Sequence, residues 1–78
     1  MTGIYIIRNI VNNKVYIGQS IDIERRWKEH KRKYQYENER KNSYLYNAIY
    51  KYGIESFSFD ILEECDKDKL NEREIYYI

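Results

Sequence analysis

The sequence predicts a small α+β domain in which a mostly antiparallel sheet of three strands is covered by helices. Two observations carry this prediction. Short runs rich in β-branched and aromatic residues mark three strands, and apolar residues at helical spacing mark three helices. The predicted order is β-β-α-α-β-α. With 78 residues and no linker or repeat, the chain is expected to form one domain over residues 1–78.

The first two strands are predicted to form a hairpin. Residues 3–9 and 15–19 have strand character, and Asn12 and Asn13 between them suit the positive backbone angles of a tight turn. A helix follows from Ile23 to about residue 36. Its N-cap is Asp22, and one mostly apolar stripe is formed by Ile23, Trp27, His30 and Tyr34.

The polar segment 37–42 is expected to be a loop. Ser43 then caps a second helix that ends at Gly53. The residues expected on its buried face are Leu45, Ala48, Ile49 and Tyr52. Residues 56–62 alternate as a half-buried strand, with Phe57, Phe59 and Ile61 on one face. Asp66 is expected to cap a third helix that runs from Lys67 to the end.

Composition excludes several classes of protein. Cys65 is the only cysteine, so neither an internal disulfide nor a metal–thiolate cluster can form. The N-terminus lacks a secretory signal, and no apolar run approaches the ~20 residues that span a membrane. We therefore expect a soluble, cytoplasmic protein. The net charge of +1 does not indicate a nucleic-acid binder, but residues 25–32 hold five Lys or Arg, one His and a single acid.

The two strands of the hairpin each carry a tyrosine. Period-2 alternation places Tyr5 and Tyr16 on one side, away from the apolar faces of Ile4 with Ile6 and of Val15 with Ile17. We expect those apolar faces to pair as a core and the tyrosines to lie together on the open side. Periodicity alone favours ordinary aromatic packing across the strands.

The first predicted helix presents a row of polar groups. Arg26 and His30 are four residues apart, and Lys33 continues the row. An arginine fork suits phosphate oxygens, and a histidine can relay a proton. The simpler interpretations are a solvated basic helix face and a histidine at the edge of the core.

The last predicted helix contains a carboxylate in its inward row. Leu70, Glu74 and Tyr77 recur at helical spacing, so Glu74 faces the protein. A buried carboxylate needs a partner. That partner is either Arg73 in a simple salt bridge or a divalent ion, since Mg²⁺ often takes only one or two protein carboxylates.

These motifs together resemble the GIY-YIG nuclease family. The motifs are Gly3-Ile4-Tyr5 and Tyr16-Ile17-Gly18, with ten residues between the two tyrosines. They are followed by Arg26-Trp27 with His30, by Lys51-Tyr52-Gly53 and by Glu72-Arg73-Glu74. The resemblance covers essentially the whole chain and is closest to the catalytic domains of phage-type, intron-encoded homing endonucleases.

The resemblance implies a metal-dependent endonuclease that hydrolyses phosphodiester bonds of DNA. Tyr5 and Tyr16 would line the site and help to activate water, Arg26 would hold the phosphate, and His30 would assist. Glu74 would be the sole protein ligand of one divalent ion, Mg²⁺ or Mn²⁺. The further cations expected to contact DNA are Lys14, Arg25 and Lys33.

The sequence also departs from the family pattern. Some branches have lysine after the second motif, where this chain has Gln19. The family usually continues into a Gly-Tyr-Asn segment beyond the catalytic glutamate, so the domain is expected to be truncated at Ile78. A separate DNA-recognition domain or partner would be needed for specificity. The alternatives are a weak or inactive DNA-binding fragment of a larger nuclease, and a structural protein whose tyrosines only pack.

Overall fold

The computed structural model describes all 78 residues. The elements are β1 (Gly3–Asn9), β2 (Val15–Ser20), α1 (Ile23–Lys33), α2 (Glu37–Arg40), α3 (Tyr44–Tyr52), β3 (Phe57–Glu64) and α4 (Leu70–Tyr77). Single 3-10 turns precede β3 and α4. None of the helices combines the length and the apolar character needed to cross a membrane.

The three strands form one antiparallel sheet in the order β2-β1-β3. The predicted α+β class is therefore confirmed, and β1 is the central strand. The hairpin turn is built as expected: Asn13 has a φ of 63°, and the side-chain oxygen of Asn12 accepts a hydrogen bond of 2.9 Å from the backbone of Lys14. Because β2 lies at the edge, groups on either face of the sheet can meet around it.

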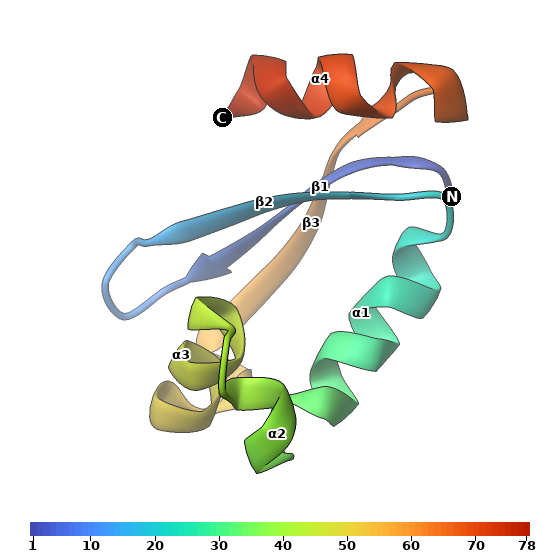
Figure 1. Ribbon diagram of the computed structural model, residues 1–78. Coiled ribbons are helices and arrows are strands. Elements are labelled where there is room, and N and C mark those ends of the chain that lie inside the picture. Colours follow the sequence, from blue (N-terminus) through green and yellow to red (C-terminus); the bar gives the residue numbers. More distant parts are fainter.

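Helices cover both faces of this sheet (Figure 1). On one face α1 and α3 pack over a core of five buried side chains, Tyr5, Ile7, Ile23, Ile49 and Phe57. On the other face α4 lies across β1 and β2, where Ile4 and Leu70 are buried. The expectation that the tyrosine side is open was wrong. The side chains of α1 and α3 close it, so Tyr5 is only 6% exposed.

The helix boundaries differ from the prediction at two places. The α1 helix begins after its predicted cap, where Asp22 accepts the backbone N–H of Arg25 at 3.2 Å, but it ends at Lys33, not near residue 36. The segment 37–40, expected to be a loop, forms the single turn α2. Arg40 stabilises this corner because its guanidinium donates to the carbonyl of Tyr34 at 2.9 Å.

The α3 helix follows the prediction more closely. The Ser43 hydroxyl accepts the backbone N–H of Tyr46 at 3.1 Å, and Gly53 ends the helix with a φ of 91°. Ile49 is fully buried, and Leu45, Ala48 and Tyr52 pack half-buried against the core.

The third strand contains an irregularity that the sequence did not reveal. Ile4 pairs with Glu63 while the next residue, Tyr5, pairs with Ile61, so a bulge lies between these pairs. Ile61 was expected to be covered, yet it is 39% exposed. The expected cap at Asp66 was also wrong, because its side chain makes no capping bond and a 3-10 turn starts the helical segment.

Candidate active site

The site is organised around the hydroxyl of Tyr5, which reaches the edge of the sheet across β2. Tyr5 pairs with Gly18, and a Cβ added to Gly18 would lie 2.5 Å from both the Cζ and the hydroxyl oxygen of Tyr5. A Cβ on Gly3 would collide with the backbone carbonyl of Glu63. Both motif glycines are therefore required by close approach: Gly18 makes room for the Tyr5 ring, and Gly3 makes room for β3.

A hydrogen-bonded chain runs inward from this hydroxyl. The Tyr5 hydroxyl lies 3.1 Å from Nε2 of His30, and Nδ1 of His30 lies 2.8 Å from the hydroxyl of Tyr46. All three side chains are buried. Sequence reasoning missed Tyr46, although it stands one turn before Ile49 on α3 and so belongs to the buried row of that helix.

The protonation of this chain follows from its burial. Burial, reinforced by the positive charge of Arg26, lowers the pKa of His30 to about 4, so the imidazole is neutral near pH 7. A neutral imidazole carries one N–H, so one tyrosine donates to His30 and the other accepts from it. Burial raises the pKa of Tyr5, and the charge of Arg26 only partly offsets this. In the protein alone, therefore, Tyr5 stays a neutral phenol.

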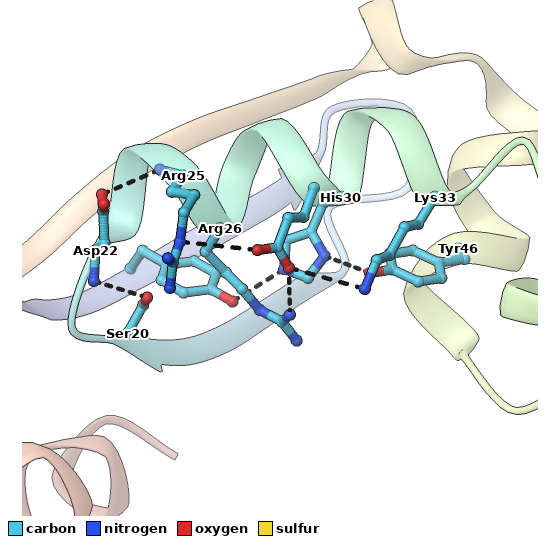
Figure 2. Close-up of polar contacts among 9 residues, drawn as sticks. Ser20, Asp22, Arg25, Arg26, His30, Lys33 and Tyr46 are labelled. Atoms are coloured by element: carbon cyan, nitrogen blue, oxygen red, sulfur yellow. Dashed lines mark hydrogen bonds and ion pairs between the residues drawn. The ribbon is translucent and has the colours of Figure 1, made fainter.

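The basic face of α1 is held together by an acid that sequence reasoning passed over. Glu29 accepts from Arg26 at 3.1 Å, and the ammonium of Lys33 lies 3.8 Å from the same carboxylate. Arg25 approaches its other oxygen at 3.9 Å. The dashed lines that end on Arg25, Arg26 and Lys33 in Figure 2 mark these contacts, and His30 points to Tyr46. The i,i+3 and i,i+4 spacing was the available signal.

Glu74 lies across the edge strand from Tyr5, on the α4 side. Its Oε1 accepts a hydrogen bond of 3.1 Å from the amide of Gln19 in β2, and that amide also donates to Asn71 at 2.8 Å. The salt bridge considered between Glu74 and Arg73 does not form, because two nitrogens of the Arg73 guanidinium donate to the carboxylate of Glu63, each at 2.8 Å. Glu74 is half-buried and has no cationic partner within 4 Å. Its negative charge contributes to the raised pKa of Tyr5.

The predicted residues are thus only partly brought together. Tyr5, Arg26 and His30 form one cluster, and Glu74 approaches it around the edge of β2. Tyr16 is half-buried two residues along the strand from Gly18. Burial and the neighbouring Tyr52 raise the pKa of Tyr16.

The amino-acid sequence places the chain in a family. Residues 1–78 match the GIY-YIG catalytic domain. The chain is a GIY-YIG domain. The family predicted from the two tyrosine motifs is therefore confirmed.

This GIY-YIG domain has relatives among intron-associated proteins. It is 39% identical over 83 residues to "Intron-associated endonuclease 1" of Enterobacteria phage T4, which covers 99% of this chain and 31% of that protein. It is 43% identical over 61 residues to "Probable intron-encoded endonuclease 1" of Neurospora crassa, which covers 78% of this chain and 18% of that protein. The domain therefore spans less than a third of the length of either relative.

Solved structures share its fold. The catalytic domain of homing endonuclease I-TevI superimposes with a TM-score of 0.80 at 36% identity, covering 100% of this chain and 85% of that one. A glutamate-to-alanine mutant of the same domain gives 0.81 at 38% identity, covering 99% and 79%. These similarities confirm the predicted three-stranded α+β architecture.

Proposed function

We propose that this GIY-YIG domain is the catalytic module of a DNA endonuclease that hydrolyses phosphodiester bonds. One observation carries the proposal: a buried Tyr5–His30–Tyr46 chain and the Arg26 guanidinium meet the unpaired carboxylate of Glu74 around a single edge strand. A candidate proton acceptor, a candidate phosphate-binding cation and a candidate metal ligand therefore lie on the two sides of β2.

The proton path starts at Tyr5. A phenol with a raised pKa accepts a proton from water only if it passes its own proton on. The neutral His30 beside it can take that proton on Nε2, provided that Nδ1 carries the imidazole hydrogen and donates it to Tyr46. Water would then attack phosphorus while its proton moves to the Tyr5 oxygen, the bond from phosphorus to the leaving 3′ oxygen breaks, and that oxygen takes up a proton from solvent. Tyr46 acts through His30, by fixing the tautomer that makes this transfer possible.

Arg26 is assigned to binding the scissile phosphate and stabilising its negative charge. Its side chain is 42% exposed, so a phosphate can reach it, while Glu29 holds the guanidinium in place from behind. A fork of donors aimed at the phosphoryl oxygens stabilises the negative charge that develops during attack. Tyr16 lies at the same edge, and we assign it a contact with the DNA beside the scissile bond.

Glu74 is assigned to one divalent ion, Mg²⁺ or Mn²⁺. The residues fit such an ion in a limited way, because no group of three His, Cys, Asp or Glu side chains gathers anywhere in the molecule. A single uncompensated carboxylate, oriented by Gln19, suits a cation that keeps several waters and takes its other ligands from phosphate. When bound, the ion would stabilise phosphoryl charge and the leaving oxygen.

Plasmid cutting tests this function. We expect the unchanged domain to nick or cleave supercoiled DNA with Mg²⁺ or Mn²⁺, and Glu74→Ala and Arg26→Ala each to cut ~10²-fold more slowly. Glu72→Ala is the matched control, since it removes an exposed charge from the same helix. Equal cutting by all four proteins would overturn the assignment of these residues. Metal-independent binding without cutting would favour a DNA-binding fragment.

Recognition of a particular DNA sequence is assigned to parts outside this domain. The two intron-associated relatives are more than three times as long as the region they share with it. We therefore propose that a further domain or partner supplies specificity, and that the isolated domain binds DNA weakly and with little sequence preference.

A further inference from the structure

A groove of about 530 Å³ lies between the hairpin and α3, next to the proposed active site. Tyr16 forms part of its wall, together with Lys14 of the hairpin turn and Lys51, Tyr52 and Tyr44 of α3. We call it the hairpin groove. Because Tyr16 belongs to both the groove and the edge of the site, the two are continuous.

The hairpin groove is positively charged without compensation. None of its nine lining residues is acidic, and neither Lys14 nor Lys51 takes part in an ion pair. The hollow lined by Arg26, His30 and Tyr46 differs, because Glu39 also lines it and Glu29 already binds Arg26 and Lys33. An incoming polyanion therefore meets free positive charge in the hairpin groove and neutralised charge on the α1 side.

The aromatic residues of the groove have the form of a nucleic-acid platform. The Tyr44 side chain is 90% exposed and buries almost nothing, so it contributes little to folding. Tyrosine rings beside lysines suit a DNA strand, because bases stack on the rings and phosphates bind the ammonium groups. The ammonium of Lys51 lies 5.3 Å from the ring of Tyr52, so the two chemistries are already adjacent.

The distance from Lys14 to the active site also fits a bound DNA strand. Tyr16 and Gly18 lie on one face of β2, with Lys14 two residues before Tyr16 at the end of the turn, and same-face residues of a strand are about 6.7 Å apart. Lys14 is therefore roughly 13 Å from the point where Tyr5 reaches the edge. Measured along the axis of a duplex, that distance corresponds to about four base-pair steps.

We infer that the hairpin groove carries the DNA strand that flanks the scissile phosphate, with Lys14 and Lys51 on its backbone and Tyr44 against a base or sugar. This inference rests on the proposed function and adds to it the path that the DNA strand follows. The strand leaves the active site over Tyr16 toward the hairpin turn, and not along the basic face of α1, where Arg25 and Lys33 had been expected to bind it.

Fluorescence anisotropy with a labelled duplex, without divalent metal so that no cutting occurs, tests the inference. We expect Lys14→Gln with Lys51→Gln to weaken binding about tenfold and to lower the salt slope by roughly 2. Lys28→Gln with Lys67→Gln removes the same charge from exposed positions without ion pairs and should weaken binding less than about threefold. Equal losses in the two double variants, or no loss in the first, would overturn the inference.

The stacking contact is tested separately. We expect Tyr44→Ala to weaken binding roughly fivefold or more, whereas Tyr50→Ala, on an exposed position of the same helix, should not. Unchanged binding by Tyr44→Ala removes this residue from the inference. Plasmid cutting by the unchanged domain, measured in parallel, reports on the proposed function by itself. An unchanged domain that cuts, with binding indifferent to the groove variants, contradicts the groove alone; one that does not bind DNA contradicts both.

Discussion

At the scale of single residues, Gly18 controls the position of the phenol at the centre of the site. A methyl group there would occupy space 2.5 Å from the tip of Tyr5, so Gly18→Ala must displace the ring. We expect cutting to fall ~10²-fold, because small misplacements of reacting groups have effects of that size. Overpacking should cost ~1–3 kcal/mol of stability. Ile49→Val, with a loss of ~1 kcal/mol in the same core, is the control in parallel plasmid and thermal-melt assays. Wild-type cutting by Gly18→Ala would contradict this role.

Tyr46 is the second residue with a testable individual role. Phenylalanine keeps its ring against the core but removes the only hydroxyl facing Nδ1 of His30. The imidazole hydrogen is then free to move to Nε2, where it blocks transfer from Tyr5. We expect kcat to fall about tenfold with KM unchanged, and ¹⁵N chemical shifts of His30 to report a tautomer change. Tyr50→Phe on the same helix is the control. An unchanged tautomer and kcat would show that Tyr46 only packs.

At the scale of elements, the bulge in β3 determines how α4 is attached. Simple alternation would place Glu63 on the same face as Ile61. The bulge instead pairs Glu63 with Ile4, on the α4 side. There its carboxylate accepts from Arg73 at 2.8 Å and from the Tyr77 hydroxyl at 2.9 Å. These bonds hold the helix that carries Glu74 at the edge of the sheet.

Glu63→Gln should loosen this attachment. The neutral amide cannot replace the forked ion pair with Arg73, so α4 should open more often. We expect amide hydrogen exchange to rise at least severalfold in residues 70–77 while α1 and α3 keep their protection, and metal-dependent cutting to fall. Glu64→Gln, an exposed neighbour without an ion pair, is the control. Equal exchange in the two variants would show that packing of Leu70 alone holds the helix.

The elements that sequence reasoning predicted correctly are those fixed by neighbours in the chain. The turn at Asn13 and the caps at Asp22 and Ser43 depend on residues within three positions. The exposure of Ile61 and the bond between His30 and Tyr46 depend on strand register and on helix docking, which local patterns do not contain. The sequence predicted the candidate site residues by type, and the structure added the face of the sheet on which each one lies.

At the scale of the whole molecule, the proposed site requires both layers of helices to be docked. Tyr5, Arg26 and His30 come from the layer formed by β1 and α1, and Glu74 comes from α4 on the opposite face. No segment of the chain holds the set by itself. Loss of either layer should therefore remove activity before the sheet unfolds. The protonation of a buried group that joins these layers should likewise depend on the stability of the whole fold.

Acid should destabilise the domain in two stages. His30 has a pKa of about 4 in the folded protein against 6.5 when unfolded, because burial and then Arg26 disfavour the imidazolium. The unfolded chain therefore takes up this proton first, so the stability linked to His30 is complete above pH 6.5 and is lost as the pH falls toward 4. Arg73 lowers the pKa of Glu63, so its contribution is complete above about 4.5 and is lost only below that. Urea midpoints should thus decline between pH 6.5 and 4.5 before any carboxylate contributes.

Gln in place of His30 can still bond both hydroxyls, and His30→Gln should have a lower midpoint that is flat across this window. A decline of equal slope in His30→Gln would assign the acid sensitivity to groups other than His30.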